Sequence, residues 1–561
     1  MGQHGGGRRH PNTNHHRPPG YGFFHRYFSR WHCPCLGQKC SRLLRKPDET
    51  RQQQALCRQD VRLCWPQQTA WNGRNAGRRP TIWFRRLIRG SSMTIVAPAP
   101  DKFDLDVPIL IIGAGTAGLV AALAAHECGA DVLVVEAAEA PSGSTALSAG
   151  LIPAAGTRFQ REAGIEDHAD VFAHDIQTKA KHENPPYLVD LLTRQSAGVI
   201  EWLADKYKFP FSVVTNFDYP GHTNRRMHGL PSRSGQELID SLRAAAENCG
   251  IDIICNRRAT KIFAQDGCIL GAELEAKNGT ELIGCDALIL ACNGYGGNRH
   301  LVHTHMPEIE NALWFGHDQN RGDAISWGSA LGADMLHLGA YQGHGNVAHP
   351  HGILITWAVI TQGGVQVNLD GERFWDESQG YSEAARSVLA QPEGVAWTIF
   401  DERIASIARQ FQDFKDAEAV GAIKIAKDFQ ELSSITGLPA ARLSETLRNI
   451  PQNETDQFGR KFGGMALAPP YHAVKVTGAL FHTQGGLTID QQARVKRKDG
   501  QVFPNLFATG GAAVGVSGSG DSGYLSGNGL LTASVLGHIA GTVASHDVTK
   551  KQPIERNQSN P

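Results

Sequence analysis

The chain has 561 residues, in which 55 Lys and Arg balance 55 Asp and Glu, and 41% of the residues are hydrophobic. This length provides for two or three domains with large cores. Its eleven cysteines include no Cys-x-x-Cys-His sequence, which excludes a c-type haem domain.

Residues 1–92 differ in composition from the rest of the chain. They carry 18 basic and three acidic residues, a net charge of +15, and the remaining 469 residues carry −15. Such an arm cannot bury a core, so we expect it to be dispensable and translation to begin at Met93. Two alternatives stay open: a disordered basic arm for nucleic acid, and a metal cluster of His32, Cys33, Cys35 and Cys40, whose spacing fits no common zinc module.

The most informative pattern follows the arm. Residues 109–112 read as a buried strand, which runs into the glycine turn 113–118 and a helix of small residues, and a second buried strand at 132–135 ends at Glu136. Because residues 107–125 carry no charge, a membrane span is the alternative. The three glycines at the phosphate-turn spacing argue against a span.

Each part of this unit has a role in binding a dinucleotide. Gly113 permits the tight turn, Gly115 lets the backbone approach a pyrophosphate, and Gly118 lets the helix lie close on the sheet. The helix N-terminus offers N–H groups to the phosphates. Glu136 is placed to accept hydrogen bonds from a ribose diol.

Further elements follow in chain order. A loop of small and hydroxyl residues is expected at 142–150, and the next elements are two helices within 166–206, a helix at 235–249, and strands at 251–255, 269–274 and 285–292. A second region opens near Gly339, with a strand-like segment at 353–369, a turn at 370–373, and helices near 382–390 and 402–448. We interpret the charged stretch 402–431 as a solvated face. The tail from Gly478 is glycine-rich and ends in a helix at 530–545.

Six motifs in this order resemble the flavoprotein family of soluble fumarate reductases, urocanate reductases, tricarballylate dehydrogenases and 3-ketosteroid dehydrogenases. They are the turn 113–118 with Glu136, and residues 144–150, 291–298, 371–377, 482–486 and 524–530. The resemblance covers about residues 105–546. It implies an α/β fold in which a discontinuous Rossmann-like FAD-binding domain, 104–338 and 482–546, carries an inserted α+β substrate or cap domain, 339–481.

The resemblance also implies which residues hold the cofactor. Membrane-bound members attach FAD covalently through a histidine in the loop after the first βαβ unit, and Ser144-Thr145 stand there in this chain, so we expect non-covalent FAD. The expected FAD-binding residues are Gly113, Gly115, Ala117, Gly118, Glu136, Ser144, Thr145, Ser148, Gly150, Ala259, Gly294, His482, Gly510, Gly529, Leu530 and Leu531.

Three departures from the fumarate reductase pattern bear on the substrate. Tyr381 and Tyr524 replace two arginines, the proton donor and a carboxylate ligand, and Phe481 replaces a substrate histidine. Without the guanidinium forks, the chain loses its main means of holding a dicarboxylate. A phenol suits a ketone, because it can polarise a carbonyl and, as phenolate, take a proton from carbon. We therefore expect Tyr381 to transfer the proton, Tyr524 to polarise the carbonyl, and His344 to match the substrate-polarising histidine.

The predicted activity is an FAD-dependent desaturation of a 3-oxosteroid-like or oxo-cyclohexane-type ketone next to its carbonyl. One alternative acts on an unsaturated carboxylate of the fumarate, urocanate or tricarballylate type, with a clamp from Arg225, Arg226, Arg233 or Arg386. Another is a non-catalytic flavin-binding redox sensor.

The remaining expectations concern partners and location. We expect a small-molecule substrate and an electron acceptor that the sequence does not identify, with no nucleic-acid partner and no integral membrane segment. The histidines around His344 lack a carboxylate frame, so no metal site is expected. Cysteines that stand singly after residue 92 suit a reducing cytoplasm.

Overall fold

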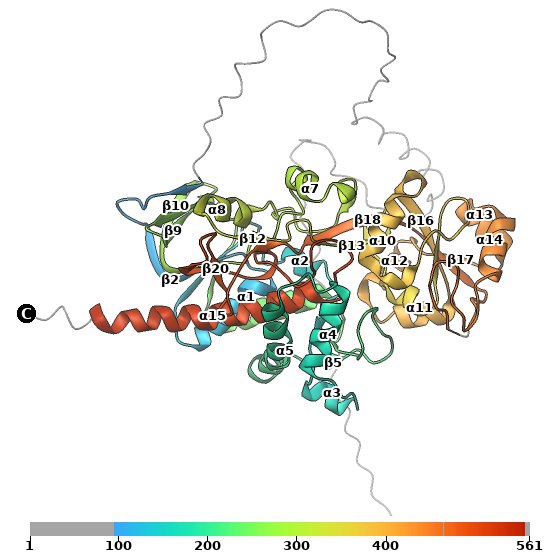
Figure 1. Ribbon diagram of the computed structural model, residues 1–561, viewed down its shortest axis with the longest axis horizontal. Coiled ribbons are helices and arrows are strands. Elements are labelled where there is room, and N and C mark those ends of the chain that lie inside the picture. Colours follow the sequence, from blue (N-terminus) through green and yellow to red (C-terminus); the bar gives the residue numbers. More distant parts are fainter. Residues whose placement is uncertain (1–94, 464, 556–561) are drawn as a thin grey trace, which may run out of the picture. The chain divides into compact units, whose positions relative to one another are not determined.

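The computed structural model describes residues 95–463 and 465–555 (Figure 1). The predicted arm, with its possible metal cluster, lies outside the described residues. Within these two ranges no helix has the length and apolarity to cross a bilayer, and no group of three or more His, Cys, Asp or Glu side chains could hold a metal ion.

A nine-stranded sheet, which we call the nucleotide sheet, forms the first half of the fold. Its order is β1-β8-β9-β10-β2-β3-β7, and β21 joins it beside β10 with β20 at its edge. The strands β10, β2, β3, β7 and β21 run parallel where they pair. Its strands are β1 (Val96–Ala97), β2 (Leu105–Ile112), β3 (Val132–Val135), β7 (Asp252–Ile254), β8 (Arg258–Gln265), β9 (Cys268–Ala276), β10 (Gly279–Leu290), β20 (Arg494–Lys496) and β21 (Val502–Ala508).

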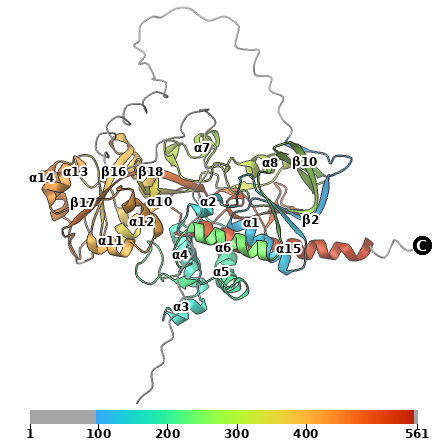
Figure 2. The same cartoon turned by 180° about the vertical axis from the view of Figure 1, so that it is seen from behind.

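Helices cover this sheet, which explains why the central strands are continuous apolar runs. The last four residues of β2 are buried, and α1 packs against both α6 and α15 (Figures 1 and 2). The helices of this half are α1 (Thr116–Glu127), α2 (Gly143–Ala146), α3 (Arg158–Glu162), α4 (Ala169–Lys179), α5 (Pro186–Tyr207), α6 (Gly235–Asn248), α7 (Arg299–His305), α8 (Asp323–Leu331) and α15 (Asn528–Glu555).

A seven-stranded sheet, the cap sheet, forms the second half. Its order is β14-β13-β18-β16-β15, and β11 and β17 also pair with the long strand β18. These strands are β11 (Leu313–Trp314), β13 (Tyr341–Ala348), β14 (Ile353–Leu354), β15 (Val365–Val367), β16 (Val395–Asp401), β17 (Lys424–Ala426) and β18 (Tyr471–Thr483). Because β11 precedes the predicted insertion point at 339, the sheet takes one strand from outside the predicted cap, and the domain boundaries stay predictions.

Helix α10 (Tyr381–Leu389) lies directly on β13, and this contact positions the site. A Cβ added at Gly345 would lie 2.4 Å from Ala384, so only glycine lets the helix approach the strand this closely. The other helices of this half are α9 (Ala358–Thr361), α11 (Glu402–Ala408), α12 (Gln412–Ala419), α13 (Phe429–Thr436) and α14 (Ala440–Arg448). Smaller pairings join β4 (Ile152–Pro153), β5 (Ser212–Val213) and β6 (Met227–Gly229), and β12 (Met335–Leu336) with β19 (Gly486–Leu487).

Three sequence expectations were wrong in detail. The loop 142–150 contains the short helix α2, the strand-like stretch 353–369 contains the helical turn α9 between β14 and β15, and the segment 402–448 is broken by β17. The elements α2, α9 and β17 have only three or four residues each, which is too short for hydrophobic periodicity to reveal them. The predicted helix at 530–545 lies inside the longer α15.

Candidate active site

A cavity extends from the glycine turn after β2 to the cap sheet, and most of the predicted site residues line it. The predicted residues in its wall are Gly113, Gly115, Ala117, Glu136, Ser144, Thr145, Ser148, Ala259, His344, Tyr381, His482, Gly510, Tyr524, Gly529 and Leu530. Four others lie outside the lining. Leu531 is fully buried in the core, and at Gly118, Gly150 and Gly294 an added Cβ would lie 2.5 Å or less from another atom of the protein. These three glycines therefore serve close packing.

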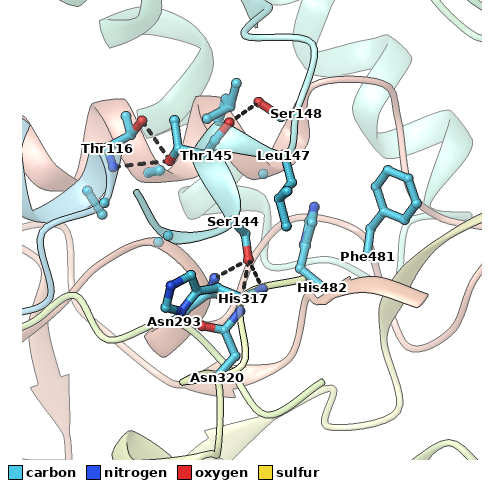
Figure 3. Close-up of a pocket in the computed structure, with 18 of the residues that line it drawn as sticks. Thr116, Ser144, Thr145, Leu147, Ser148, Asn293, His317, Asn320, Phe481 and His482 are labelled. Atoms are coloured by element: carbon cyan, nitrogen blue, oxygen red, sulfur yellow. Dashed lines mark hydrogen bonds between the residues drawn. The ribbon is translucent and has the colours of Figure 1, made fainter. Parts of the chain in front are cut away.

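The glycine turn leaves the N-terminus of α1 open to an anion. Gly113 has a φ of +108°, which favours glycine, and no acidic residue lies in the first turn of α1. Thr145 Oγ1 accepts a hydrogen bond from Thr116 N at 3.2 Å and lies 3.0 Å from Thr116 Oγ1 (Figure 3). This contact joins α2 to the turn, and it places hydroxyl groups beside the positive end of the helix dipole.

Glu136 is held in one orientation by backbone donors. Its Oε2 accepts from Ala114 N at 2.8 Å and its Oε1 accepts from Ala138 N at 2.9 Å. Each carboxylate oxygen keeps a further lone pair, so Glu136 can still accept hydrogen bonds from the diol of a nucleotide ribose.

Ser144 accepts hydrogen bonds from three residues that were not predicted from the sequence. Its Oγ accepts from Asn320 Nδ2 at 2.8 Å, from Asn293 Nδ2 at 3.2 Å and from His317 N at 3.4 Å (Figure 3). All three line the cavity. Asn293 lies within the motif at residues 291–298, whereas His317 and Asn320 come from a polar loop with no periodic signal.

The three predicted catalytic side chains form one aromatic cluster. His344 stacks on Tyr381 with ring centroids 4.7 Å apart and on Phe481 at 5.1 Å, and the Tyr381 and Tyr524 rings are 6.0 Å apart. Trp357 meets the edge of this cluster 6.2 Å from Tyr381. The exposed fractions of His344, Tyr381 and Tyr524 are only 4%, 9% and 6%.

Burial decides the charge states in this cluster. Desolvation lowers the pKa of His344 to about 3, raises the pKa of Tyr524 to about 12 and raises that of Tyr381 well above its usual range. At neutral pH the imidazole is therefore neutral and both phenols carry their protons. A lowered tyrosine pKa would have provided a ready phenolate, and the structure shows the opposite direction for both tyrosines.

Hydrogen bonds connect the two phenols to the backbone of the C-terminal glycine run. Tyr381 shares hydrogen bonds with the Tyr524 hydroxyl and with Ser526, and Tyr524 Oη accepts from Gly529 N at 3.4 Å. The Gly529 N–H thus holds the Tyr524 phenol at the cavity wall, where the Tyr524 O–H could donate to an oxygen of a ligand.

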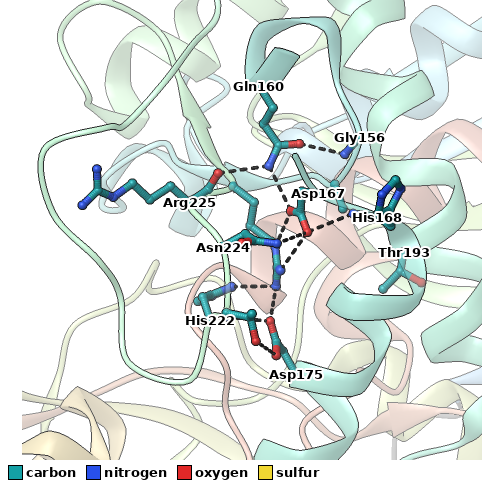
Figure 4. A network of polar contacts seen from close by, with 12 residues as sticks. Gly156, Gln160, Asp167, His168, Asp175, Thr193, His222, Asn224 and Arg225 are labelled. Carbon is teal, nitrogen blue, oxygen red and sulfur yellow. Dashed lines mark hydrogen bonds and ion pairs between the residues drawn. The ribbon is translucent and has the colours of Figure 1, made fainter. Parts of the chain in front are cut away.

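The four arginines considered as a carboxylate clamp do not line the cavity. Arg226 is buried in a network in which its guanidinium donates to Asp167 at 2.9 and 3.1 Å and to Asp175 at 2.6 Å. Figure 4 labels these two aspartates. Arg225 pairs with Asp218, Arg233 binds Ser212 and the Gly229 carbonyl, and Arg386 pairs with Asp521.

Two other arginines do line the cavity, at its nucleotide end. Arg257 N donates to the Glu136 carbonyl, and its side chain pairs with Glu281. Arg258 binds both carboxylate oxygens of Asp323 at 2.9 and 2.7 Å. Within the described part of the chain, the aromatic end of the cavity therefore has no arginine in its wall.

The cavity suits a dinucleotide with a planar redox group. Thr483 Oγ1 and Trp357 Nε1 are buried and have no hydrogen-bond partner among the described residues, and both residues line the cavity. Such groups call for a polar ligand. With the open N-terminus of α1 and the fixed Glu136 at the other end, this wall fits FAD.

Comparisons with known proteins agree with this geometry. The sequence profile of the family described as FAD binding domain matches residues 108–530. The chain is 32% identical over 457 residues to a probable fumarate reductase of Shewanella frigidimarina. The aligned region covers 79% of this chain and 75% of that protein. It resembles the open conformation of a flavocytochrome c3 fumarate reductase with a TM-score of 0.68 and 30% identity, covering 80% and 79% of the two chains.

A second structural likeness is limited to the fold. A 3-ketosteroid-Δ4-(5α)-dehydrogenase of Rhodococcus jostii in complex with 4-androstene-3,17-dione aligns with a TM-score of 0.62 at 22% identity, covering 80% of this chain and 99% of that one.

Proposed function

The chain belongs to the FAD binding domain family, and from this premise we propose that it desaturates an uncharged ketone at the carbon–carbon bond next to the carbonyl. The predicted family, the α/β class, the FAD cofactor and an oxidoreductase that acts on carbon–carbon bonds are confirmed. The choice of a ketone rests on one observation: the aromatic end of the cavity presents two buried phenols and no arginine.

The chemistry divides between cofactor and protein. When bound, FAD supplies the hydride acceptor. Tyr524, whose phenol oxygen accepts from Gly529 N, donates its O–H to the carbonyl oxygen and stabilises the negative charge that develops on it. Tyr381 moves the proton of the adjacent carbon. Because burial raises its pKa, Tyr381 must release its own proton before it can accept one, and it supplies a proton directly in the reverse direction, the reduction of the double bond.

The surrounding aromatic rings orient the substrate and exclude water. His344 is neutral at working pH because burial lowers its pKa to about 3. It therefore acts through hydrogen bonding and stacking rather than through charge. Phe481 and Trp357 complete an apolar wall, which suits a ring system and would bind a free carboxylate poorly.

A second candidate is the reduction of an unsaturated carboxylate, which the likeness to fumarate reductases favours. It requires a cation to face the substrate carboxylate. The arginines that line the cavity are bound to Glu281 and Asp323. Binding of a carboxylate would therefore require an arginine to leave its acidic partner, which binding of a ketone does not require.

Anaerobic mixing of the FAD-loaded protein with single substrates separates the two candidates. A 3-oxosteroid or a cyclohexanone should bleach the oxidised flavin, whereas succinate should leave its absorbance unchanged. In the reverse assay, fumarate and urocanate should fail to reoxidise the reduced flavin. Bleaching by none of a broad ketone panel, together with reoxidation by fumarate, would overturn the proposal.

A further inference from the structure

The two halves of the fold are joined at the start of α10, the helix whose first residue is Tyr381. Lys179, the last residue of α4, donates from its ammonium group to the Gln379 carbonyl at 2.7 Å and to the Glu383 carboxylate. These two acceptors lie two residues before and two residues after Tyr381. One side chain of the nucleotide half therefore binds the cap half on both sides of Tyr381.

The Lys179–Glu383 ion pair is largely shielded from water. The exposed fractions of the two side chains are 16% and 6%. A Cβ added at Gly380 would lie 3.0 Å from Glu383 Oε2 and 3.7 Å from Lys179 Nζ, so the backbone passes close to both charged groups. Burial raises the pKa of Glu383, and the charge of Lys179 opposes that rise. Because water screens this attraction little, the removal of one partner costs far more free energy than at an exposed pair.

The two phenols of the cavity come from different halves of the fold. Tyr381 belongs to the helix that packs on β13 of the cap sheet, whereas Tyr524 belongs to the glycine run that leads into α15. Their ring centroids are 6.0 Å apart. A second ion pair, Arg386–Asp521, also links α10 to that run, but the Arg386 side chain is 55% exposed, and such a pair contributes little. The shielded ion pair is therefore the stronger of the two links.

We propose that Lys179 is a positioning residue, which holds Tyr381 against Tyr524 by anchoring the start of α10. This inference rests on the proposed function, because it supports the proton transfer assigned there to Tyr381. Lys179 does not line the cavity, so it acts on the reaction only through Tyr381. A misplacement of a reacting group by about 1 Å costs on the order of 10²-fold in rate. The loss of the anchor should therefore slow the reaction and leave substrate binding nearly unchanged.

The test is anaerobic bleaching of the flavin by a ketone in the full-length FAD-loaded enzyme. Lys179→Met keeps most of the length of the side chain and removes its charge and its donors. It should lower the limiting bleaching rate about 10- to 100-fold and change the half-saturating ketone concentration less than about twofold. Lys179→Arg keeps a cation for Glu383 and should retain most of the rate.

Lys261→Met is the matched control. Lys261 pairs with Glu273 at 2.8 Å between β8 and β9, its side chain is 26% exposed, and it does not line the cavity. The same substitution in this other half-buried pair should leave both bleaching parameters unchanged. An equal loss of rate in Lys261→Met and Lys179→Met would overturn the inference, since it would report a general effect of a broken ion pair.

A double variant separates positioning from stability. Lys179→Met alone leaves the Glu383 carboxylate without its cation and should lower the urea concentration of unfolding. Lys179→Met combined with Glu383→Gln removes both charges, so stability should return toward the wild-type value while the bleaching rate stays low. Recovery of both stability and rate in the double variant would overturn the inference, because only the unpaired charge would then have caused the defect.

Hydrogen exchange separates this inference from the proposed function, because it requires no substrate. In the FAD-loaded protein, Lys179→Met should speed the exchange of the backbone amides of residues 384–389 by about tenfold and leave the amides of α1 unchanged. Faster exchange there, without bleaching by any ketone, would support the anchor while the proposed reaction fails. Unchanged exchange in α10 would overturn the inference even if ketones are desaturated.

Discussion

The replacement of Tyr381 by Phe tests the assigned proton transfer most directly. It removes one hydroxyl and keeps the ring that stacks on His344 at 4.7 Å. The lost hydrogen bonds connect Tyr381 to Tyr524 and Ser526, and one such bond contributes about 1 kcal/mol to stability. The variant should therefore fold, keep its FAD, and unfold at nearly the wild-type urea concentration.

The effect on catalysis should be much larger than the effect on stability. A positioned acid or base contributes about 10²- to 10⁴-fold to the rate, which corresponds to about 3–5 kcal/mol in the barrier. Since the aromatic wall is unchanged, KM should stay near its wild-type value and kcat should carry the loss. Anaerobic stopped-flow bleaching of the flavin measures this step without the need to know the electron acceptor.

Tyr341→Phe provides the matched control. Tyr341 is fully buried in β13, the strand that carries His344, and it does not line the cavity. The Tyr341→Phe substitution removes a buried hydroxyl outside the cavity, so it should leave the bleaching rate unchanged. A bleaching rate of Tyr381→Phe within about threefold of the wild-type rate would refute proton transfer by Tyr381, since this difference is far below the contribution of a positioned base.

Four further outcomes test other parts of the structure. Arg226→Met leaves Asp167 and Asp175 buried without their cation, so urea titration should show a loss of about 3–5 kcal/mol; unchanged stability with lost fumarate affinity would make Arg226 a clamp. Gly118→Ala puts a Cβ 1.8 Å from Gly113 O, so affinity for FAD, read from flavin fluorescence, should fall about tenfold, and equal affinity would contradict close packing. Acid precipitation should release all the flavin, and fluorescence that stays on the polypeptide would reveal a covalent link. Because burial raises the pKa of Tyr381, the desaturation rate should rise about tenfold per pH unit below that pKa, and a pH-independent rate would exclude the phenolate as base.

The first βαβ unit of the nucleotide sheet was predictable because its signals are local. The strand β2, the turn and α1 follow one another without a break, and four apolar residues at the end of β2 are buried on both faces of the sheet. Neither a distant partner nor an unusual backbone is needed to recognise this unit. The same holds for α15, whose apolar residues run for many turns.

Strand β13 of the cap sheet was not predictable because it lacks an apolar pattern. All eight residues of β13 are buried, and they include the polar residues Gln342, His344 and Asn346 and two glycines. Such a strand shows no alternation. It pairs with β18, more than a hundred residues later, and with register shifts beside His344. Only the folded chain reveals that Gln342 and His344 line a cavity and that Asn346 is hydrogen-bonded to Ile355 O and Thr398 Oγ1.

The site residues, too, were predictable only where they belong to one continuous segment. The glycine turn and Glu136 belong to one continuous segment, so spacing was enough to find them. Asn293, His317 and Asn320 meet at the Ser144 oxygen from separate segments. The charged stretch 402–431 was interpreted as a solvated face, yet Asp413 within it lines the cavity. Charge alone does not tell which turn of a short helix faces inward.

Identity to a fumarate reductase therefore says little about the substrate. The 32% identity is spread over 457 residues, whereas the choice between a dicarboxylate and a ketone depends on a few cavity positions. A hydrogen bond to a charged group contributes about 1.5–3 kcal/mol, so a cavity without the two guanidinium partners expected for a dicarboxylate should bind it on the order of 10²- to 10⁴-fold more weakly. The two phenols at the aromatic end would return none of that free energy to a carboxylate. They leave the aromatic end of the cavity with hydrogen-bond donors that match a single carbonyl oxygen.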